Sequence, residues 1–224
     1  MLLRIADVLK PDELKLARAW LAEGPFVDGK LSAGAAARRV KQNEERDRDA
    51  GDVDRLDRLV MGALNRHPGY RSGALPLHAA SPLYARYRPG MTYGEHLDDP
   101  VMGTGGVLYR SDVAVTVFLS EPGDYDGGEL VVRTGAGAHA VKEAAGSAVL
   151  YPAGTLHRVA PVTRGERLVA VTWVQSLVRD PARRELLHGL NLAREKLLQQ
   201  APEAQETAQV NASYLNLIRM WSDL

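Results

Sequence analysis

Two histidines and one aspartate in this sequence are spaced as ligands of a single metal ion. His96 and Asp98 lie two residues apart, and on an extended segment such residues point to the same side. His157 lies in a later segment, after a predicted strand and a Pro-Ala-Gly turn. Two imidazoles and one carboxylate form the facial triad that suits Fe(II) and leaves coordination positions open. Taken alone, the His96–Asp98 pair is more often a surface loop, and His157 fits a half-buried histidine bonded to a loop carbonyl.

Arg167 opens a predicted strand on the face that it shares with Val169 and Val171. An arginine on the apolar face of a core strand is costly unless an anion meets it, and a guanidinium group matches a carboxylate with two parallel hydrogen bonds. The position therefore predicts a carboxylate-binding site in the same domain as the metal ligands. Two alternatives stay open: the side chain reaches solvent at the strand end, or it pairs with Glu129 or Glu166.

The elements that must position these residues are β-strands in the middle of the chain. The candidate strands cover residues 82–89, 111–120, 127–133, 147–152 and 167–176. Turns rich in Pro, Gly and Asp separate them, and no helical pattern lies between them, which indicates an antiparallel sandwich or barrel. Gly127 and Gly128 are expected to serve a turn or a bulge at the entry of a strand.

Both ends of the chain are predicted to be helical. One helix begins at Pro11, a second covers 53–67, and two more follow Asp180 and pack as a hairpin. The apolar stripes of the last two are Leu186, Leu190, Ala193 and Leu197, and Val210, Tyr214, Leu217 and Trp221. His188 lies off the first stripe and is expected to face solvent. Residues 30–52 are small and then densely charged, which predicts a solvated or mobile stretch.

The chain composition narrows the classes of function. Lys plus Arg (28) balance Asp plus Glu (28), so the broad positive field that nucleic acid attracts is absent. The lack of cysteine excludes disulfides, cysteine zinc sites and thiol nucleophiles. No apolar stretch approaches a membrane span and no signal peptide is recognisable, so the sequence predicts a cytoplasmic protein without nucleic-acid or membrane partners.

Three segments, YARYRPGMTYGEHLD, YDGGELVV and YPAGTLHRVAPVTRGERLVAVTWVQS, resemble the PKHD-type hydroxylases, bacterial relatives of the prolyl and lysyl hydroxylase catalytic domain. The stretches AARRVKQNE and SYLNLIRMWSDL extend the resemblance over almost the whole chain. It implies a mainly β fold with flanking helices: a double-stranded β-helix (jelly-roll) core plus a C-terminal helical extension. The expected division is an N-terminal helical flank over 1–75, the oxygenase core over 76–178 and the extension over 179–224.

The resemblance also implies what the site residues do. The implied Fe(II) ligands are His96, Asp98 and His157. Arg167 would bind the distal carboxylate of 2-oxoglutarate. Tyr84 and Tyr87 lie on opposite faces of one strand, and the resemblance favours Tyr84 as the hydroxyl donor to 2-oxoglutarate. The glycine-containing loop 99–110 after the metal pair fits a lid or substrate rim and a flexible hairpin loop equally well.

The implied reaction hydroxylates a C–H bond with O₂ and 2-oxoglutarate, gives succinate and CO₂, and uses L-ascorbate as a reductant for oxidised iron. The substrate is a peptide side chain or a small molecule, and the C-terminal helices could form a homo-oligomer. One rival is a non-catalytic jelly-roll metal-binding or iron-sensing protein, which would not need Arg167. Another is a metal-assisted hydrolase with Glu95 as base, although on a strand Glu95 points away from the metal.

Overall fold

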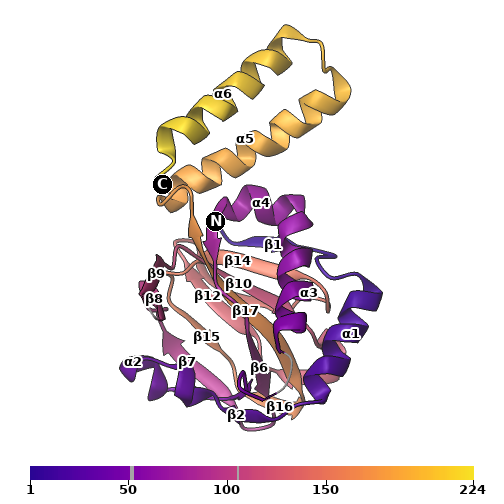
Figure 1. The fold of residues 1–224 in the computed structure, drawn as a ribbon, viewed down its shortest axis with the longest axis vertical. Helices are drawn as coiled ribbons and strands as arrows, with labels where there is room; N and C mark the ends of the chain where they lie inside the picture. Colours follow the sequence, from indigo (N-terminus) through magenta and orange to yellow (C-terminus); the bar gives the residue numbers. More distant parts are fainter. Residues whose placement is uncertain (51–52, 105) are drawn as a thin grey trace.

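Two antiparallel sheets face each other across the core of the computed structural model, which describes residues 1–50, 53–104 and 106–224 (Figure 1). The larger sheet runs β1 (Leu3–Ile5), β14 (Ala148–Pro152), β10 (Val113–Phe118), β17 (Arg167–Ser176), β6 (Leu83–Tyr87), β4 (Glu44–Arg46) and β2 (Phe26–Asp28), and β5 (Pro76–Ala79) pairs with β17. The smaller sheet runs β13 (Gly137–Val141), β12 (Leu130–Thr134), β15 (His157–Val159), β7 (Thr92–His96) and β3 (Lys41–Gln42). Two further two-stranded antiparallel pairs are present: β8 (Val101–Thr104) with β9 (Val107–Arg110), and β11 (Tyr125–Gly127) with β16 (Val162–Gly165). The predicted mainly β core with flanking helices is confirmed.

Strand β10 shows why the larger sheet is buried on both sides. All six of its residues are buried. Val115 and Val117 point to the face that the helices cover, and Ala114 and Phe118 point to the face that meets the smaller sheet. Because side chains alternate along a strand, a continuous apolar run such as this one fits a strand with no solvent-facing side. Thr116 is the polar exception, and it lines a cavity between the sheets.

Helices α1 (Pro11–Ala22), α3 (Val53–Arg66) and α4 (Pro68–Ala74) cover the outer face of the larger sheet (Figure 1). The first two confirm the predicted helices. Helix α4 was not predicted, because His67-Pro68-Gly69 has the composition of a helix end. In the structure the His67 imidazole Nδ1 accepts a hydrogen bond from the Gly69 amide (3.1 Å), so His67 caps a new helix with Pro68 in its first turn.

The prediction of a solvated or mobile stretch over 30–52 is wrong for residues 41–46, although residues 30–40 are exposed or half-buried as expected. The structure forms η1 (Gly29–Ser32), α2 (Ala35–Arg38), β3 and β4 there. Four polar residues are buried: Lys41, Asn43, Glu45 and Arg46. The charges are compatible with burial because they find partners, such as the Lys41–Glu45 ion pair. Residues 51 and 52 lie outside the described residues.

The first 75 residues therefore supply strands to both sheets as well as helices. Strand β3 extends the smaller sheet beside β7, and β4 extends the larger sheet beside β6. Gly127 and Gly128 confirm the predicted bulge, since the register with β16 shifts at Gly127 and both residues have positive φ (69° and 68°).

Helices α5 (Pro181–Gln200) and α6 (Gln205–Trp221) form the predicted hairpin, which projects away from the barrel (Figure 1). The predicted apolar stripe of α6 is half-buried, but in α5 Leu187 is buried while Leu186 of the predicted stripe is exposed. The expectation that His188 faces solvent is wrong. Its Nδ1 lies 3.0 Å from the Ser72 hydroxyl, because α4 packs against this end of α5 and turns that face into a contact. Among the described residues, no helix is both long enough and apolar enough to cross a membrane.

Candidate metal centre

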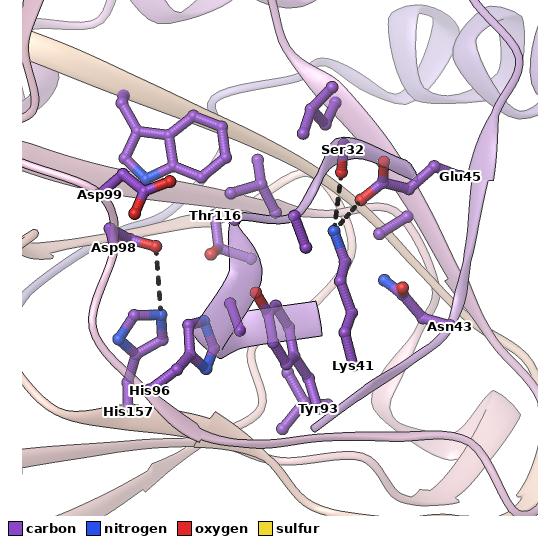
Figure 2. Close-up of a pocket in the computed structure, with 18 of the residues that line it drawn as sticks. Ser32, Lys41, Asn43, Glu45, Tyr93, His96, Asp98, Asp99, Thr116 and His157 are labelled. Carbon is purple, nitrogen blue, oxygen red and sulfur yellow. Dashed lines mark hydrogen bonds and ion pairs between the residues drawn. The ribbon is translucent and has the colours of Figure 1, made fainter. Parts of the chain in front are cut away.

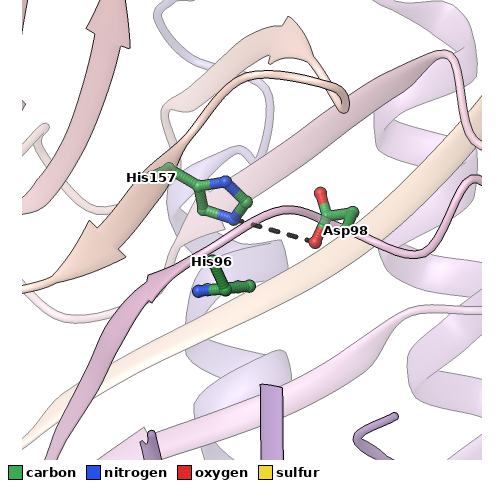
Figure 3. A group of neighbouring side chains, drawn as sticks. All are labelled: His96, Asp98 and His157. Carbon is green, nitrogen blue, oxygen red and sulfur yellow. Dashed lines mark ion pairs between the residues drawn. The ribbon is translucent and has the colours of Figure 1, made fainter. Parts of the chain in front are cut away.

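The three predicted metal ligands converge at one end of the smaller sheet (Figure 3). His96 is the last residue of β7 and His157 the first of β15, and the two are direct partners in the strand register. Asp98 follows β7 two residues later. The candidate ligand atoms of the three side chains all lie within 4.8 Å of one another, and His157 Nε2 is 3.7 Å from Asp98 Oδ1. The structure thus brings together the triad that the spacing predicts.

The two imidazole rings are held in the tautomer that metal binding requires. His96 Nδ1 lies 2.8 Å from the Gly94 carbonyl oxygen, and His157 Nδ1 lies 2.9 Å from the Thr155 carbonyl oxygen. A carbonyl oxygen only accepts, so Nδ1 carries a hydrogen in both rings, and Nε2 is the ring atom that can bind a metal. Burial, followed by the neighbouring His157, lowers the pKa of His96 to about 4, which keeps that ring neutral.

The Asp98 side chain is buried, and its Oδ2 has no hydrogen-bond partner among the described residues. Burial raises the pKa of the carboxyl group, and the nearby His157 acts in the opposite direction. A divalent cation would balance the charge of the Asp98 carboxylate and coordinate the oxygen that lacks a hydrogen-bond partner. Two imidazoles whose Nδ1 atoms donate to backbone carbonyls, together with one such carboxylate, therefore fit a first-row metal ion such as Fe(II).

A cavity of about 360 Å³ extends from the triad into the space between the sheets (Figure 2). The larger sheet contributes Tyr87, Thr116, Tyr151 and Arg167 to its wall. Residues 32–45 close it from a second side, with Ser32, Lys41, Asn43 and Glu45. The cavity thus combines apolar walls with a small number of polar and charged side chains, as expected for a small-molecule site.

Arg167 is 1% exposed and lines this cavity. Its Nε and one terminal nitrogen have no hydrogen-bond partner, and within the described part of the chain it forms no ion pair. The alternatives that the sequence left open are therefore not realised, because the side chain does not reach solvent and Glu166 instead binds Arg88 at 3.2 Å. A buried guanidinium without a counter-charge carries a large desolvation cost, which a bound carboxylate would offset.

The structure corrects the choice of Tyr84. Its hydroxyl donates a 2.9 Å hydrogen bond to Asp57 Oδ1 beneath α3, on the side of β6 away from the cavity. Tyr87, on the opposite face of the strand, lines the cavity, with its ring centroid 5.0 Å from the Arg167 guanidinium carbon. Burial raises the pKa of Tyr87 to about 12 while the Arg167 charge lowers it, so the hydroxyl stays protonated and able to donate. Both faces of β6 meet an apolar core, which is why the sequence did not show which tyrosine faces inward.

Sequence reasoning missed the cavity residues from the N-terminal segment. Every second residue from Lys41 in β3 through Asn43 to Glu45 in β4 lines the cavity. This period of two within a charged stretch is the sequence feature that could have indicated an extended segment facing the cavity. Val101 and Met102 of the β8–β9 pair also line the cavity, which places part of the predicted loop 99–110 at its rim. Residue 105 of that loop lies outside the described residues.

Glu95 points away from the metal centre, as the sequence analysis expected. Its carboxylate forms a 2.6 Å ion pair with Arg133 at the outer face of the smaller sheet. It is therefore placed badly to act as a base on a metal-bound water, which weakens the hydrolase alternative.

Comparison with known proteins shows which family the chain belongs to. Residues 82–175 match the model of the 2OG-Fe(II) oxygenase superfamily, and residues 181–223 match the PKHD-type hydroxylase C-terminal domain. The PKHD-type hydroxylase Tgr7_2199 of Thioalkalivibrio sulfidiphilus is 51% identical over 224 residues, which cover 100% of both chains. The chain belongs to the PKHD-type hydroxylases. It is a 2-oxoglutarate- and Fe(II)-dependent dioxygenase.

Solved structures support the fold of this PKHD-type hydroxylase. A Trichoplax adhaerens prolyl hydroxylase in complex with a hypoxia inducible factor peptide fragment aligns with a TM-score of 0.57 at 17% identity, over 83% of this chain and 86% of that one. HygX from Streptomyces hygroscopicus, with nickel, 2-oxoglutarate and hygromycin B bound, aligns with a TM-score of 0.53 at 17% identity, over 79% and 84%. The predicted jelly-roll core is confirmed.

Proposed function

We propose that His96, Asp98 and His157 hold Fe(II), and that Arg167 binds the distal carboxylate of 2-oxoglutarate. The observation that carries this assignment is the buried Arg167 guanidinium, which has no counter-charge among the described residues and opens into the same cavity as the triad. A dicarboxylate could bind the metal through one carboxylate and supply the counter-charge for this guanidinium through the other. When bound, the iron supplies the oxygen chemistry that a protein side chain cannot provide.

The chain's own residues would bind and orient the reactants. The carbonyl oxygens of Gly94 and Thr155 fix the two imidazole rings, and Tyr87 presents a protonated hydroxyl beside Arg167. The walls from both sheets exclude bulk water, which strengthens each of these electrostatic contacts. The expected outcome is hydroxylation of a substrate C–H bond, with 2-oxoglutarate converted to succinate and CO₂. Ascorbate remains an expectation from family resemblance.

The substrate is proposed to be a peptide side chain or a small molecule that enters between the N-terminal segment and the β8–β9 pair. Gly34, Leu97 and Val101 line the cavity there, and the two apolar side chains are exposed. Two proteins of related fold bind a peptide fragment and hygromycin B, respectively, so this fold admits both sizes of ligand. We propose that the β8–β9 pair forms the substrate rim.

The finer organisation is also proposed here. Residues 1–75 would serve as a flank that completes the cavity wall, 76–178 as the oxygenase core, and 179–224 as an extension that supports self-association. Exposed apolar side chains on the hairpin favour the last role: Leu186, Leu192, Leu215 and Met220. The absence of cysteine is compatible with the proposed cytoplasmic location, where thiols stay reduced.

The test of the proposed function separates an enzyme from an iron sensor. The full-length protein is incubated with Fe(II), 2-oxoglutarate and O₂, and succinate is quantified against Asp98→Ala and Arg167→Met. We expect 2-oxoglutarate-dependent succinate formation from the wild type, even without added substrate, and loss of it in both variants. Stoichiometric Fe(II) binding with succinate no higher than in the variants would support the sensor instead.

A further inference from the structure

Strand β3 places a buried lysine beside the metal centre. Lys41 is 5% exposed, lines the cavity and is the direct strand partner of Tyr93 in β7. On the other side of β7, His96 pairs with His157 in β15. The smaller sheet therefore places Lys41 beside Tyr93 and, three residues further along β7, His96 beside His157.

The Lys41 ammonium group is fixed in place by two contacts. Its Nζ lies 2.5 Å from Glu45 Oε1 and 2.9 Å from the Ser32 hydroxyl oxygen (Figure 2). A buried ion pair is weak evidence for stabilisation, because the desolvation cost cancels much of the attraction. A well-packed apolar pair would serve stability at least as well, so the pair calls for another explanation.

The Tyr93 ring lies between Lys41 and His96 (Figure 2). Its centroid is 3.6 Å from the His96 ring centroid, with 14° between the planes, and the Lys41 Nζ is 5.3 Å from the Tyr93 centroid. The Tyr93 ring therefore stacks on the metal ligand on one side and meets a cation on the other, an arrangement that the ring quadrupole favours.

We propose that Tyr93 and Lys41 are positioning residues that hold the His96 imidazole in its metal-binding orientation. The hydrogen bond from Nδ1 to Gly94 fixes one point of the ring but allows the plane to tilt about that point, and the parallel Tyr93 ring removes this freedom. Lys41, anchored by Glu45 and Ser32, restrains Tyr93 in turn. The inference rests on the proposed Fe(II) site.

His157 shows why only one ligand needs this support. It is more deeply buried than His96, and its ring neighbours are inclined to it: His96 at 4.3 Å and 51°, and Tyr151 at 5.1 Å and 62°. Rings that pack from several directions restrain it without a parallel partner. His96 is half-buried and depends on the stack. The N-terminal segment, which precedes the matched oxygenase region 82–175, would therefore complete the metal site.

The test measures the Fe(II) dissociation constant of the full-length protein under anaerobic conditions, without 2-oxoglutarate, by competition with a chromophoric chelator. Removing an outer partner of a metal ligand typically weakens binding by about 10- to 100-fold, and we expect this for Tyr93→Leu. Tyr93→Phe keeps the ring and should stay within about threefold of wild type. Tyr214→Leu, which removes a half-buried tyrosine ring that contacts Arg194 on the C-terminal hairpin, is the matched control and should leave the affinity unchanged.

Lys41 is tested without leaving a buried charge unpaired. The double variant Lys41→Met/Glu45→Gln keeps the net charge of the wall, and we expect roughly two- to fivefold weaker Fe(II) binding from the lost cation–π contact. The single variant Lys41→Arg keeps the cation and its partner Glu45, and it should retain wild-type Fe(II) affinity. The double variant also keeps the proposal testable should Tyr93→Leu fail to fold.

Fe(II) affinity within about threefold of wild type for Tyr93→Leu would overturn the proposal, as would equal losses in Tyr93→Leu and Tyr93→Phe. If Tyr93→Leu does not fold, unchanged affinity in the double variant would overturn it. Absence of Fe(II) binding in the wild type would instead refute the proposed function. Folding of each variant is checked by circular dichroism, so that a purely structural loss is recognised.

Discussion

The cavity and the C-terminal hairpin both contain side chains whose polarity does not match their surroundings, but in opposite senses. In the cavity, the Asp98 carboxylate and the Arg167 guanidinium are buried, and each has polar atoms without a hydrogen-bond partner in the part of the chain that the structure describes. On the hairpin, Leu186 (65% exposed), Leu192 (58%) and Met220 (72%) are apolar and face solvent. An unpaired buried polar group costs about 1 to 3 kcal/mol, and more if charged, whereas single exposed apolar side chains are common on protein surfaces. The free-energy cost of leaving the cavity without a ligand is therefore larger than the cost of leaving the hairpin without a second subunit.

The largest effect is expected at the metal ligands. Asp98→Ala removes the carboxylate that balances the cation, and we expect Fe(II) affinity to fall by at least about 100-fold, beyond the range for outer partners. Asp99→Ala is the matched control, because the neighbouring carboxylate is exposed. Isothermal titration under anaerobic conditions measures both. Equal losses in the two variants would mean that charge near the cavity, and not ligation by Asp98, controls binding.

The next effect concerns the other end of the cavity. Arg167→Met should weaken 2-oxoglutarate binding by about 2 to 5 kcal/mol, because it removes a charge-assisted contact in a desolvated pocket. Fe(II) affinity should hardly change, since Arg167 lies outside the triad. Arg164→Met provides the control, because Arg164 is exposed and pairs with Asp126 at 2.7 Å. Unchanged 2-oxoglutarate affinity in Arg167→Met would exclude the proposed role.

A smaller effect separates the two tyrosines of β6. Tyr87→Phe should weaken 2-oxoglutarate binding by about 1 to 2 kcal/mol through loss of one hydroxyl donor. Tyr84→Phe should leave that affinity unchanged and lower the free energy of unfolding by about 1 kcal/mol, because it breaks the bond to Asp57. Binding titrations and urea denaturation measure the two quantities. The reverse pattern would restore the prediction that the resemblance favoured.

The smallest effect is expected on the hairpin. If its exposed leucines support self-association, Leu186→Ser with Leu192→Ser should reduce the mass per particle in light scattering and leave Fe(II) and 2-oxoglutarate binding intact. Leu31→Ser, which changes an exposed leucine on the N-terminal segment, should not alter the mass. The same number of subunits in all three proteins would exclude the hairpin as the interface.

The parts of the site that could be predicted depend on local geometry. The spacing of His96 and Asp98 places both side chains on one side of an extended segment, and the position of Arg167 on an apolar strand face requires an anion. These arguments need only the alternation of side chains along a strand. The predicted strands are present for the same reason, as β6, β10, β12, β14 and β17.

The parts that failed depend on contacts between distant segments. Lys41 and Glu45 are buried because β3 joins β7, β4 joins β6, and the two side chains pair with each other, which a charged sequence does not reveal. His188 is buried because α4, distant in sequence, packs on its face of α5. Tyr84 and Tyr87 could be assigned to opposite faces of β6, but the choice of the inner face depends on which core each one enters.

The visible absorption of the anaerobic protein, recorded as Fe(II) and then 2-oxoglutarate are added, tests directly whether the triad and Arg167 form one site. We expect a metal-to-ligand charge-transfer band that appears only when both are present and saturates as a single class of site. Arg167→Met should form the same band at higher 2-oxoglutarate concentrations, and Asp98→Ala should form none. A wild-type protein that binds Fe(II) but develops no band at saturating 2-oxoglutarate would contradict the claim that the triad and Arg167 form one dioxygenase site.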